Sequence, residues 1–287
     1  MCTSLRYKSC FGRNYDYEKS YDEEIRRVKR NEFDNEYAII GVCAGLVEDF
    51  PLFYDAMNEY GLCMSGLAFS GNAYYKDYDE IPYGHHIYNP YSFILDILGE
   101  FRNVSEVKER LKYSSILDES YSKDFPNTDL HWIISDKEQT IVVEATEEGL
   151  GVYDNPFEVL TNNPPFPMMR DEINFNLEHN IGNHGEYDGG KWTSRGTETL
   201  GLKGDYTSAG RFERAAYLRK KLLESDTLFS DVCETFHLLR SVEQIYGGTP
   251  VADSFEYTIY SVVYDLEELS VEMRTYDDGS VVKKLVV

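Results

Sequence analysis

The order of strand-like and helix-like segments constrains the fold of this chain more than any other feature. Residues 37–45 and 61–69 are apolar runs bounded by turn residues, and residues 130–146 are two β-rich runs around a polar DKEQ turn. Strand character returns in residues 257–276 and 279–287. Strands therefore dominate both ends of the chain.

Helical patterns lie between these strand regions. Residues 89–101 have helical character, and in the following segment Asn103 is a candidate N-cap with Glu106 three residues later, the spacing of a capping box. Two further helices are expected near residues 208–224 and 230–242. Strands, then helices, then strands predict an α+β fold with antiparallel sheets rather than a parallel βαβ series.

The bulk properties limit the number of domains and the partners. The chain has 287 residues and neither a repeat nor a Pro/Gly/Ser linker, which predicts one domain over residues 2–287 once Met1 is removed. Its 51 acidic residues against 28 Lys and Arg argue against nucleic acid and membrane surfaces as partners. An anionic substrate would need a local Arg or Lys. No apolar signal or spanning segment is present, so we expect a cytoplasmic protein.

Neither a metal nor an organic cofactor is predicted. The five cysteines show no C-x-x-C spacing and indicate reduced thiols. His85 and His86 are adjacent and would point apart on a strand, while His179 and His184 are spaced by five residues, which does not suit one helical face. Glycine-rich nucleotide-binding motifs are absent from the sequence.

A cysteine directly follows the initial methionine. If Met1 is removed, the α-amine of Cys2 has an intrinsic pKa of about 7.7 to 8, so a large fraction is neutral and able to accept a proton at physiological pH. One residue then supplies both a thiol nucleophile and a base. Small residues are common at position 2, so a chance placement stays open.

The next residues predict a hairpin that brings polar groups toward Cys2. Strands at 2–8 and 11–16 would pair antiparallel with residue numbers summing to about 18 or 19, which places Asp16 within one residue of Cys2. Its carboxylate could then bind the terminal ammonium. Arg13 would lie on the face opposite Asp16, so both reach the thiol only if the backbone bulges. The alternative is that Arg13 and Asp16 form an ordinary surface pair.

The segments MCTS and FGRNYDYE resemble the N-terminal signature of the choloylglycine hydrolase family, which includes conjugated bile salt hydrolases and penicillin V acylases. Further matches follow in order along the chain: MNEYGLCMSGLAF, NTDLHWIISD, IVVEATEEGLGVYDN, VLTNNPPF and GDYTSAGRF. The resemblance implies a four-layer αββα sandwich of the N-terminal-nucleophile hydrolase type, with two antiparallel sheets between helix layers. It also implies hydrolysis of linear amide carbon–nitrogen bonds without a cofactor.

The resemblance assigns roles to five residues. Cys2 would be the nucleophile and general base, supported by Arg13 and Asp16, while Asn162 would donate to the oxyanion and Arg211 would complete the charged shell. A positioned oxyanion donor contributes about 2.7 to 4 kcal/mol to the stability of the transition state. The two arginines would favour the thiolate. Without the resemblance, Asn162 is typical of a turn and Arg211 of a helix surface.

The resemblance also indicates a substrate. Ala68 stands where bile salt hydrolases carry Asn and penicillin acylases carry Tyr, but its backbone N–H, the second oxyanion donor of the family, is retained. Tyr15, Tyr17 and Phe69 are candidate wall residues of an apolar pocket, and each could equally be core.

The favoured substrate is a glycine- or taurine-conjugated bile acid, because the LHW segment and the residues flanking Ala68 are closer to the bile salt hydrolases. Alternatives are penicillin V or another N-acyl amide, including N-acyl amino acids. A different class of function also stays open, namely a non-catalytic protein that binds an acyl ligand on the same scaffold. Related enzymes are often tetrameric, so a homo-oligomer is expected.

Overall fold

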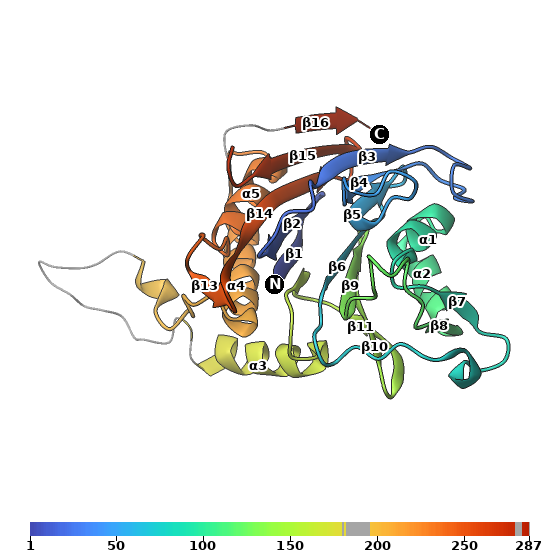
Figure 1. The fold of residues 1–287 in the computed structure, drawn as a ribbon. Helices are drawn as coiled ribbons and strands as arrows, with labels where there is room; N and C mark the ends of the chain where they lie inside the picture. Colours follow the sequence, from blue (N-terminus) through green and yellow to red (C-terminus); the bar gives the residue numbers. More distant parts are fainter. Residues whose placement is uncertain (180, 182–195, 279–282, 287) are drawn as a thin grey trace, which may run out of the picture.

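Two large antiparallel sheets lie face to face at the centre of the molecule, with helices on both outer sides (Figure 1). The computed structural model describes residues 1–179, 181, 196–278 and 283–286. His184 and residues 279–282 and 287 therefore lie outside the described residues. The layers follow the order helix, sheet, sheet, helix, which confirms the predicted αββα sandwich.

The first sheet contains both ends of the described chain. Its strands lie in the order β12 (Val159–Leu160), β1 (Cys2–Tyr7), β2 (Cys10–Tyr17), β14 (Ser254–Asp265), β15 (Ser270–Thr275) and β16 (Lys283–Val286), with β13 (Thr249–Val251) also paired to β14. Every pairing in this sheet is antiparallel.

The second sheet is built from the middle of the chain. Its order is β11 (Gly149–Asp154), β10 (Thr140–Thr146), β9 (Leu130–Ser135), β6 (Cys63–Ala68), β5 (Phe53–Asn58), β4 (Ile39–Cys43) and β3 (Glu24–Val28). The hairpin predicted over 130–146 is confirmed as β9 and β10. A small parallel pair, β7 (His86–Tyr88) with β8 (Ser114–Ile116), lies beside the helices on this side.

Helices cover the outer face of each sheet. On the second sheet lie α1 (Phe93–Glu100) and α2 (Val104–Leu111), and on the first lie α4 (Ser208–Leu223) and α5 (Asp231–Arg240). The N-cap prediction is confirmed, because the Asn103 side chain accepts a hydrogen bond from the Glu106 N–H at 3.0 Å. The sequence patterns did not predict α3 (Phe166–His179), which lies against α4.

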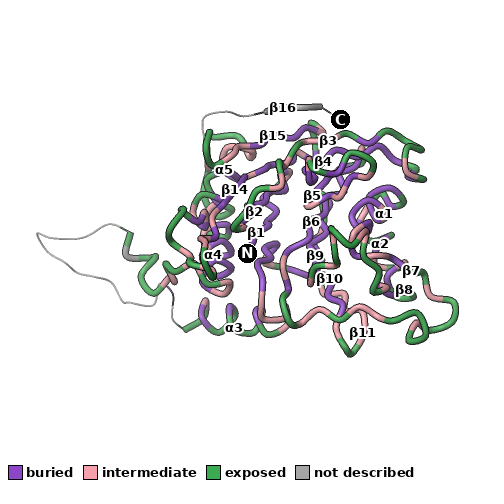
Figure 2. The backbone as a smooth tube through the Cα atoms, viewed as in Figure 1, coloured by how far each residue is buried: buried purple, intermediate pink, exposed green. Residues whose placement is uncertain are grey.

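Apolar side chains form two cores. One fills the space between the sheets and extends under α4 and α5, and the other lies between the second sheet and α1 with α2. Figure 2 shows that the central strands are buried along their length. All six residues of β1 are buried, so polar side chains on this strand must find partners inside the protein.

The register of the N-terminal hairpin differs from the prediction. Cys2 pairs with Tyr15 and Ser4 with Arg13, so the residue numbers sum to 17 rather than 18 or 19. Directly paired residues share a face of the sheet, which places Cys2 and Arg13 together on the face toward the second sheet. Asp16 lies on the opposite face, as predicted. Arg13 therefore reaches Cys2 without a bulge between the two strands.

No helix in the described part of the chain combines the length and apolar character that a membrane crossing requires.

Candidate active site

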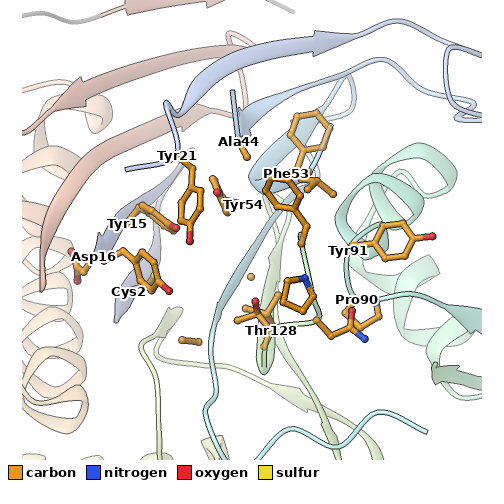
Figure 3. A pocket seen from close by; sticks show the side chains of 18 of the residues that line it. Cys2, Tyr15, Asp16, Tyr21, Ala44, Phe53, Tyr54, Pro90, Tyr91 and Thr128 are labelled. Atoms are coloured by element: carbon orange, nitrogen blue, oxygen red, sulfur yellow. The ribbon is translucent and has the colours of Figure 1, made fainter. Parts of the chain in front are cut away.

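The sulfur-bearing side chain of Cys2 lies in the wall of a cavity of about 550 Å³ (Figure 3). Cys2 is only 4% exposed, so a group that reaches the sulfur must enter through this cavity. Eight of the other lining residues are aromatic and come from both sheets and from the segments beside α1: Tyr15, Tyr17, Tyr21, Phe53, Tyr54, Tyr91, Tyr121 and Phe125.

Arg13 connects the two sheets at the thiol. Its Nη2 donates to Cys2 Sγ at 3.3 Å and to the carbonyl of Gly66 in the second sheet at 2.7 Å. Its Nη1 donates to the carbonyl of Tyr54 and to Asp55 Oδ2, the latter at 3.1 Å. Both terminal nitrogens of the guanidinium are bound by these partners, while its buried Nε has no hydrogen-bond partner among the described residues.

Asp55 is the buried anionic partner of Arg13. Besides Arg13, its carboxylate accepts hydrogen bonds from the hydroxyls of Tyr260 at 2.6 Å and Tyr264 at 2.5 Å, and it has no exposed surface. Burial opposes the charge of Arg13, yet Cys2, Tyr260 and Asp55 hold the pKa of Arg13 well above its ordinary value. The guanidinium is therefore a fixed cation beside the sulfur.

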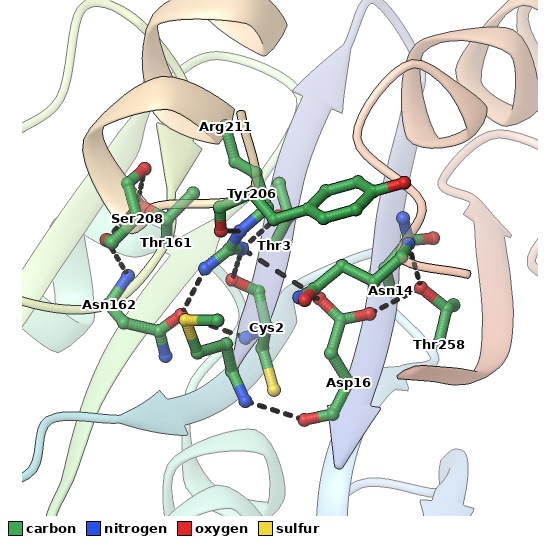
Figure 4. A network of polar contacts seen from close by, with 12 residues as sticks. Cys2, Thr3, Asn14, Asp16, Thr161, Asn162, Tyr206, Ser208, Arg211 and Thr258 are labelled. Carbon is green, nitrogen blue, oxygen red and sulfur yellow. Dashed lines mark hydrogen bonds and ion pairs between the residues drawn. The ribbon is translucent and has the colours of Figure 1, made fainter. Parts of the chain in front are cut away.

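Arg211 approaches the same residue from the helix side of the hairpin (Figure 4). Its Nη1 donates to the carbonyl of Cys2 at 2.6 Å and to Thr3 Oγ1 at 2.7 Å, and its Nε donates to the carbonyl of Tyr206 at 3.1 Å. Its Nη2 donates to Asn162 Oδ1 at 2.8 Å. Arg211 thus fixes the backbone of Cys2 rather than its thiol.

Asn162 joins Cys2 to the second sheet. Its Oδ1 accepts from the backbone N–H of Cys2 at 2.9 Å, and its Nδ2 donates to the carbonyl of Ala68 at 2.8 Å. Its own N–H donates to Ser208 Oγ at 2.8 Å, at the start of α4. A carboxamide nitrogen carries two hydrogens, so Asn162 can hold Ala68 and still donate a second bond.

The carboxylate of Asp16 lies on the helix side of the hairpin in this structure, in which Met1 is still attached, so its expected contact with the free ammonium of Cys2 stays a prediction. It accepts from Thr258 Oγ1 at 2.6 Å and Gln244 Nε2 at 2.8 Å and lies 3.8 Å from Arg211 Nη1, all on the helix side. The ammonium of Met1 donates instead to the backbone carbonyl of Asp16 at 2.7 Å. In this hairpin register the side chains of Asp16 and Cys2 lie on opposite faces.

Three of the four candidate wall residues line the cavity, and Phe69 does not. Tyr15, Tyr17 and Ala68 are in the lining. Phe69 is fully buried and stacks on His131 with ring centroids 4.4 Å apart, so it is a core residue. Alternation along the chain explains the error, since neighbours at the end of β6 point in opposite directions.

The amine of Met1 is largely removed from water. Its ammonium forms an ion pair with Glu256, a carboxylate that also lines the cavity. Burial is the main cause of a pKa below the ordinary value of 8.0 for this amine, and the cations Arg13 and Arg211 lower it further. An amine in this position is therefore neutral at a lower pH than a free N-terminus.

Sequence analysis did not identify two polar residues of the site, Asp55 and His131. Asp55 gave a signal, because a lone carboxylate in an apolar run indicates a paired buried charge. His131 gave none. Its ring nitrogens lie 3.1 Å from Glu144 Oε1 and 3.0 Å from the carbonyl of Thr161, so it anchors the residue before Asn162.

The described residues offer no metal site, since no group of three or more His, Cys, Asp or Glu side chains is arranged to hold an ion. His85 Nδ1 instead lies 3.0 Å from Ser115 Oγ, and His86 Nδ1 lies 3.5 Å from Arg110.

Comparison with known proteins gives a consistent result. A family model described as linear amide C–N hydrolases, choloylglycine hydrolase family, matches residues 2–285. A bile salt hydrolase/transferase of Lactiplantibacillus plantarum is 40% identical over 98% of this chain and 91% of the relative. The solved C2A mutant of the conjugated bile acid hydrolase from Clostridium perfringens aligns with a TM-score of 0.89 at 33% identity, covering 100% of this chain and 92% of that one. Penicillin V acylase from Agrobacterium tumefaciens, at 18% identity and a TM-score of 0.71 over 96% of this chain and 83% of that one, shares the fold.

Replacement of Asp55 tests the buried network. Asp55→Asn keeps the shape but leaves Arg13 without its anionic partner, and breaking a buried ion pair lowers the free energy of unfolding by about 3 to 5 kcal/mol. Urea titration followed by circular dichroism measures this change. The matched control is Asp253→Asn, which removes an exposed carboxylate and should change the stability by less than about 0.5 kcal/mol. Equal stabilities of the two variants would contradict the described network.

Proposed function

Because this chain belongs to the choloylglycine hydrolase family and is a linear amide C–N hydrolase, we propose that it cleaves conjugated bile acids with Cys2 as the nucleophile. The observation that carries the proposal is the position of Cys2 Sγ, which contacts Arg13 at 3.3 Å and lies at an aromatic cavity. The substrate assignment rests on similarity to relatives named for bile salts, together with the character of the cavity.

Maturation by removal of Met1 is part of the proposal. Residues 2–287 then form one amidase domain whose first residue carries the free amine. That amine is positioned by Asn162 Oδ1, which already accepts from the nitrogen of Cys2 at 2.9 Å. Because Cys2 is buried, the pKa of its free amine should lie below the ordinary value for an N-terminal amine.

In the first half of the reaction, Cys2 Sγ attacks the amide carbonyl carbon and its proton passes to the α-amine. The carbonyl oxygen becomes an oxyanion, for which the N–H of Ala68 and the second Nδ2–H of Asn162 are the proposed donors. The carbon–nitrogen bond then breaks as the protonated amine gives its proton to the leaving nitrogen. An acyl thioester on Cys2 and a free amine result.

In the second half, water replaces the leaving amine. The α-amine of Cys2 takes a proton from this water as its oxygen attacks the thioester carbon. Collapse of the second tetrahedral intermediate breaks the carbon–sulfur bond and releases a carboxylic acid. Arg13 stabilises the sulfur when it leaves as a thiolate, and Arg211 with Asp16 keeps the backbone of Cys2 in place.

The aromatic part of the cavity is the proposed acyl site. A steroid is rigid and apolar, and it is best bound by a largely apolar surface with few polar groups at the reacting end. Tyr15 and Tyr54 stack with ring centroids 4.7 Å apart, and the Arg13 guanidinium lies 5.1 Å from the Tyr15 ring. Figure 3 shows Tyr91 on the other side of the cavity. Homo-oligomer formation and a cytoplasmic location stay predictions.

A panel of amides tests this function. We expect release of glycine or taurine from their cholyl conjugates, and little release of phenoxyacetate from penicillin V. Cys2→Ser should reduce turnover by about 100-fold or more, since a hydroxyl is a far weaker nucleophile than a thiolate. The control Cys233→Ser changes a cysteine outside the cavity lining and should retain full activity.

Three results of this panel would count against the proposal. Faster cleavage of penicillin V would reassign the substrate. Binding of cholyl conjugates without turnover would favour the non-catalytic alternative. Equal turnover by Cys2→Ser and the parent would exclude the mechanism.

The pH dependence tests the role of the amine. A base must be neutral to accept the thiol proton, so kcat/KM should fall as the pH drops through the amine pKa. Because Cys2 is buried and burial lowers the pKa of an amine, the midpoint of the acid limb should lie below 8.0, the ordinary value for an N-terminal amine. A midpoint at or above this value would show that the amine is not shielded from water as described.

A further inference from the structure

His131 is a buried polar residue that contacts the segment carrying Asn162. It lies on β9 and has no exposed surface. Its Nε2 lies 3.0 Å from the carbonyl oxygen of Thr161, the residue before Asn162. A carbonyl oxygen only accepts hydrogen bonds, so Nε2 carries a hydrogen and donates it to Thr161. The other ring nitrogen, Nδ1, lies 3.1 Å from Oε1 of Glu144.

Glu144 holds the other end of the same segment. It pairs with His131 across β9 and β10, is 1% exposed, and accepts from the backbone N–H of Phe166 at 2.9 Å. Residues 161–166 are therefore fixed at their first carbonyl and at their last N–H. Within the described part of the chain, Oε2 of Glu144 has no hydrogen-bond partner. Such a buried polar pair stabilises a fold no better than apolar side chains would, which points to a role at the site.

The ring of His131 also contacts the chain beside the second proposed oxyanion donor. It stacks on Phe69 with ring centroids 4.4 Å apart and ring planes inclined by 8°. Phe69 directly follows Ala68, and the pairing of β6 with β9 places Leu67 opposite His131. Both chain neighbours of Ala68 are thus held against His131, and the backbone N–H of Ala68 lies between them.

The two proposed oxyanion donors meet between these contacts. Asn162 Nδ2 donates to the carbonyl of Ala68 at 2.8 Å, which sets the carboxamide relative to β6. Ser208 binds the N–H of Asn162 at 2.8 Å and the hydroxyl of Thr161 at 2.9 Å, but it lies on α4, outside the first sheet (Figure 4). His131 links the segment directly to the second sheet, which also carries Ala68.

We propose that His131 is a positioning residue for the oxyanion hole. Its bond to Thr161 fixes the carboxamide of Asn162. Its stacking contact with Phe69 fixes the backbone N–H of Ala68. The inference rests on the proposed function, and it concerns a residue outside the described lining of the cavity. Misplacing a catalytic group by about 1 Å can cost about 100-fold in rate, so loss of these contacts lowers kcat rather than substrate binding.

Two carboxamide substitutions of His131 test the bond to Thr161. Gln can place its side-chain nitrogen near the position of Nε2 and donate to this carbonyl, whereas Asn reaches only the position of Nδ1. Both remove the ring. For the amide that the parent cleaves fastest, His131→Asn should lower kcat by about 100-fold and leave KM within about threefold. His131→Gln should retain kcat to within about tenfold, because it keeps the donor.

The aldehyde analogue of cholic acid gives a readout that a merely structural role would not move. The sulfur of Cys2 adds to its carbonyl carbon, the carbon–oxygen electron pair moves to the oxygen, and the thiol proton passes to the Cys2 amine. This adduct carries the oxyanion of the reaction. Its inhibition constant should rise by about 100-fold in His131→Asn, while that of cholate, which forms no adduct, should stay within about threefold.

Ile134→Ala is the matched control for lost packing. Ile134 lies on the same strand and is buried, but it packs in the core beside α1 and α2. The variant should lower the urea midpoint and keep kcat and aldehyde inhibition within about threefold. If His131→Asn does not fold, Glu144→Asp replaces it in the test. This change shortens the reach to His131 and Phe166 and should lower kcat by about tenfold at unchanged KM.

Every outcome bears on the inference. Parent-like kcat in His131→Asn, or in Glu144→Asp, would overturn it. Equal losses of kcat in both His131 variants and the Ile134→Ala control would do the same, because they would report packing alone. A rise in KM without a fall in kcat would assign His131 to substrate binding instead. If the parent cleaves no amide of the panel, the proposed function is refuted, and the inference with it.

Discussion

The site depends on Arg13, a buried cation on the first sheet that donates hydrogen bonds to the second sheet. Arg13 leaves the first sheet, donates to carbonyls of the second and contacts the sulfur of Cys2 on the way. A guanidinium without exposed surface is tolerable only because Asp55 and two tyrosine hydroxyls compensate its charge. The same contacts that hold the sheets together thus place a positive charge beside the proposed nucleophile.

The two faces of the N-terminal hairpin have different roles: one carries the reacting thiol, and the other carries residues that position Cys2. The face toward the second sheet carries the thiol and Arg13, and it opens into the aromatic cavity. The face toward the helices carries Thr3 and Asp16, which bind or approach Arg211. Asn162 joins the two faces, since it binds the nitrogen of Cys2, Arg211 and Ala68. Successive residues of β1 and β2 therefore alternate between the face with the reacting groups and the face that holds Cys2 in place.

The family resemblance in the sequence predicted the architecture and named five residues whose catalytic roles stay proposals, but the sequence did not predict the hairpin register. The turn at Lys8 and Ser9 uses a positive φ of 48° at Lys8, a conformation that Asn or Gly would have signalled and Lys does not. A shift of one or two in the paired numbers decides which residues face Cys2. Local patterns also could not reveal Tyr260, because its strand meets the N-terminal hairpin only in the folded sheet.

The central claim is that the sulfur and the free amine of one terminal residue perform the reaction. Mass analysis of the N-terminal peptide, taken from enzyme quenched in acid during turnover of a cholyl amide, tests this claim most directly. The account predicts a peptide that begins at Cys2 and carries a cholyl thioester on that residue. An acyl group on another residue, or on a peptide that still begins with Met1, would contradict it.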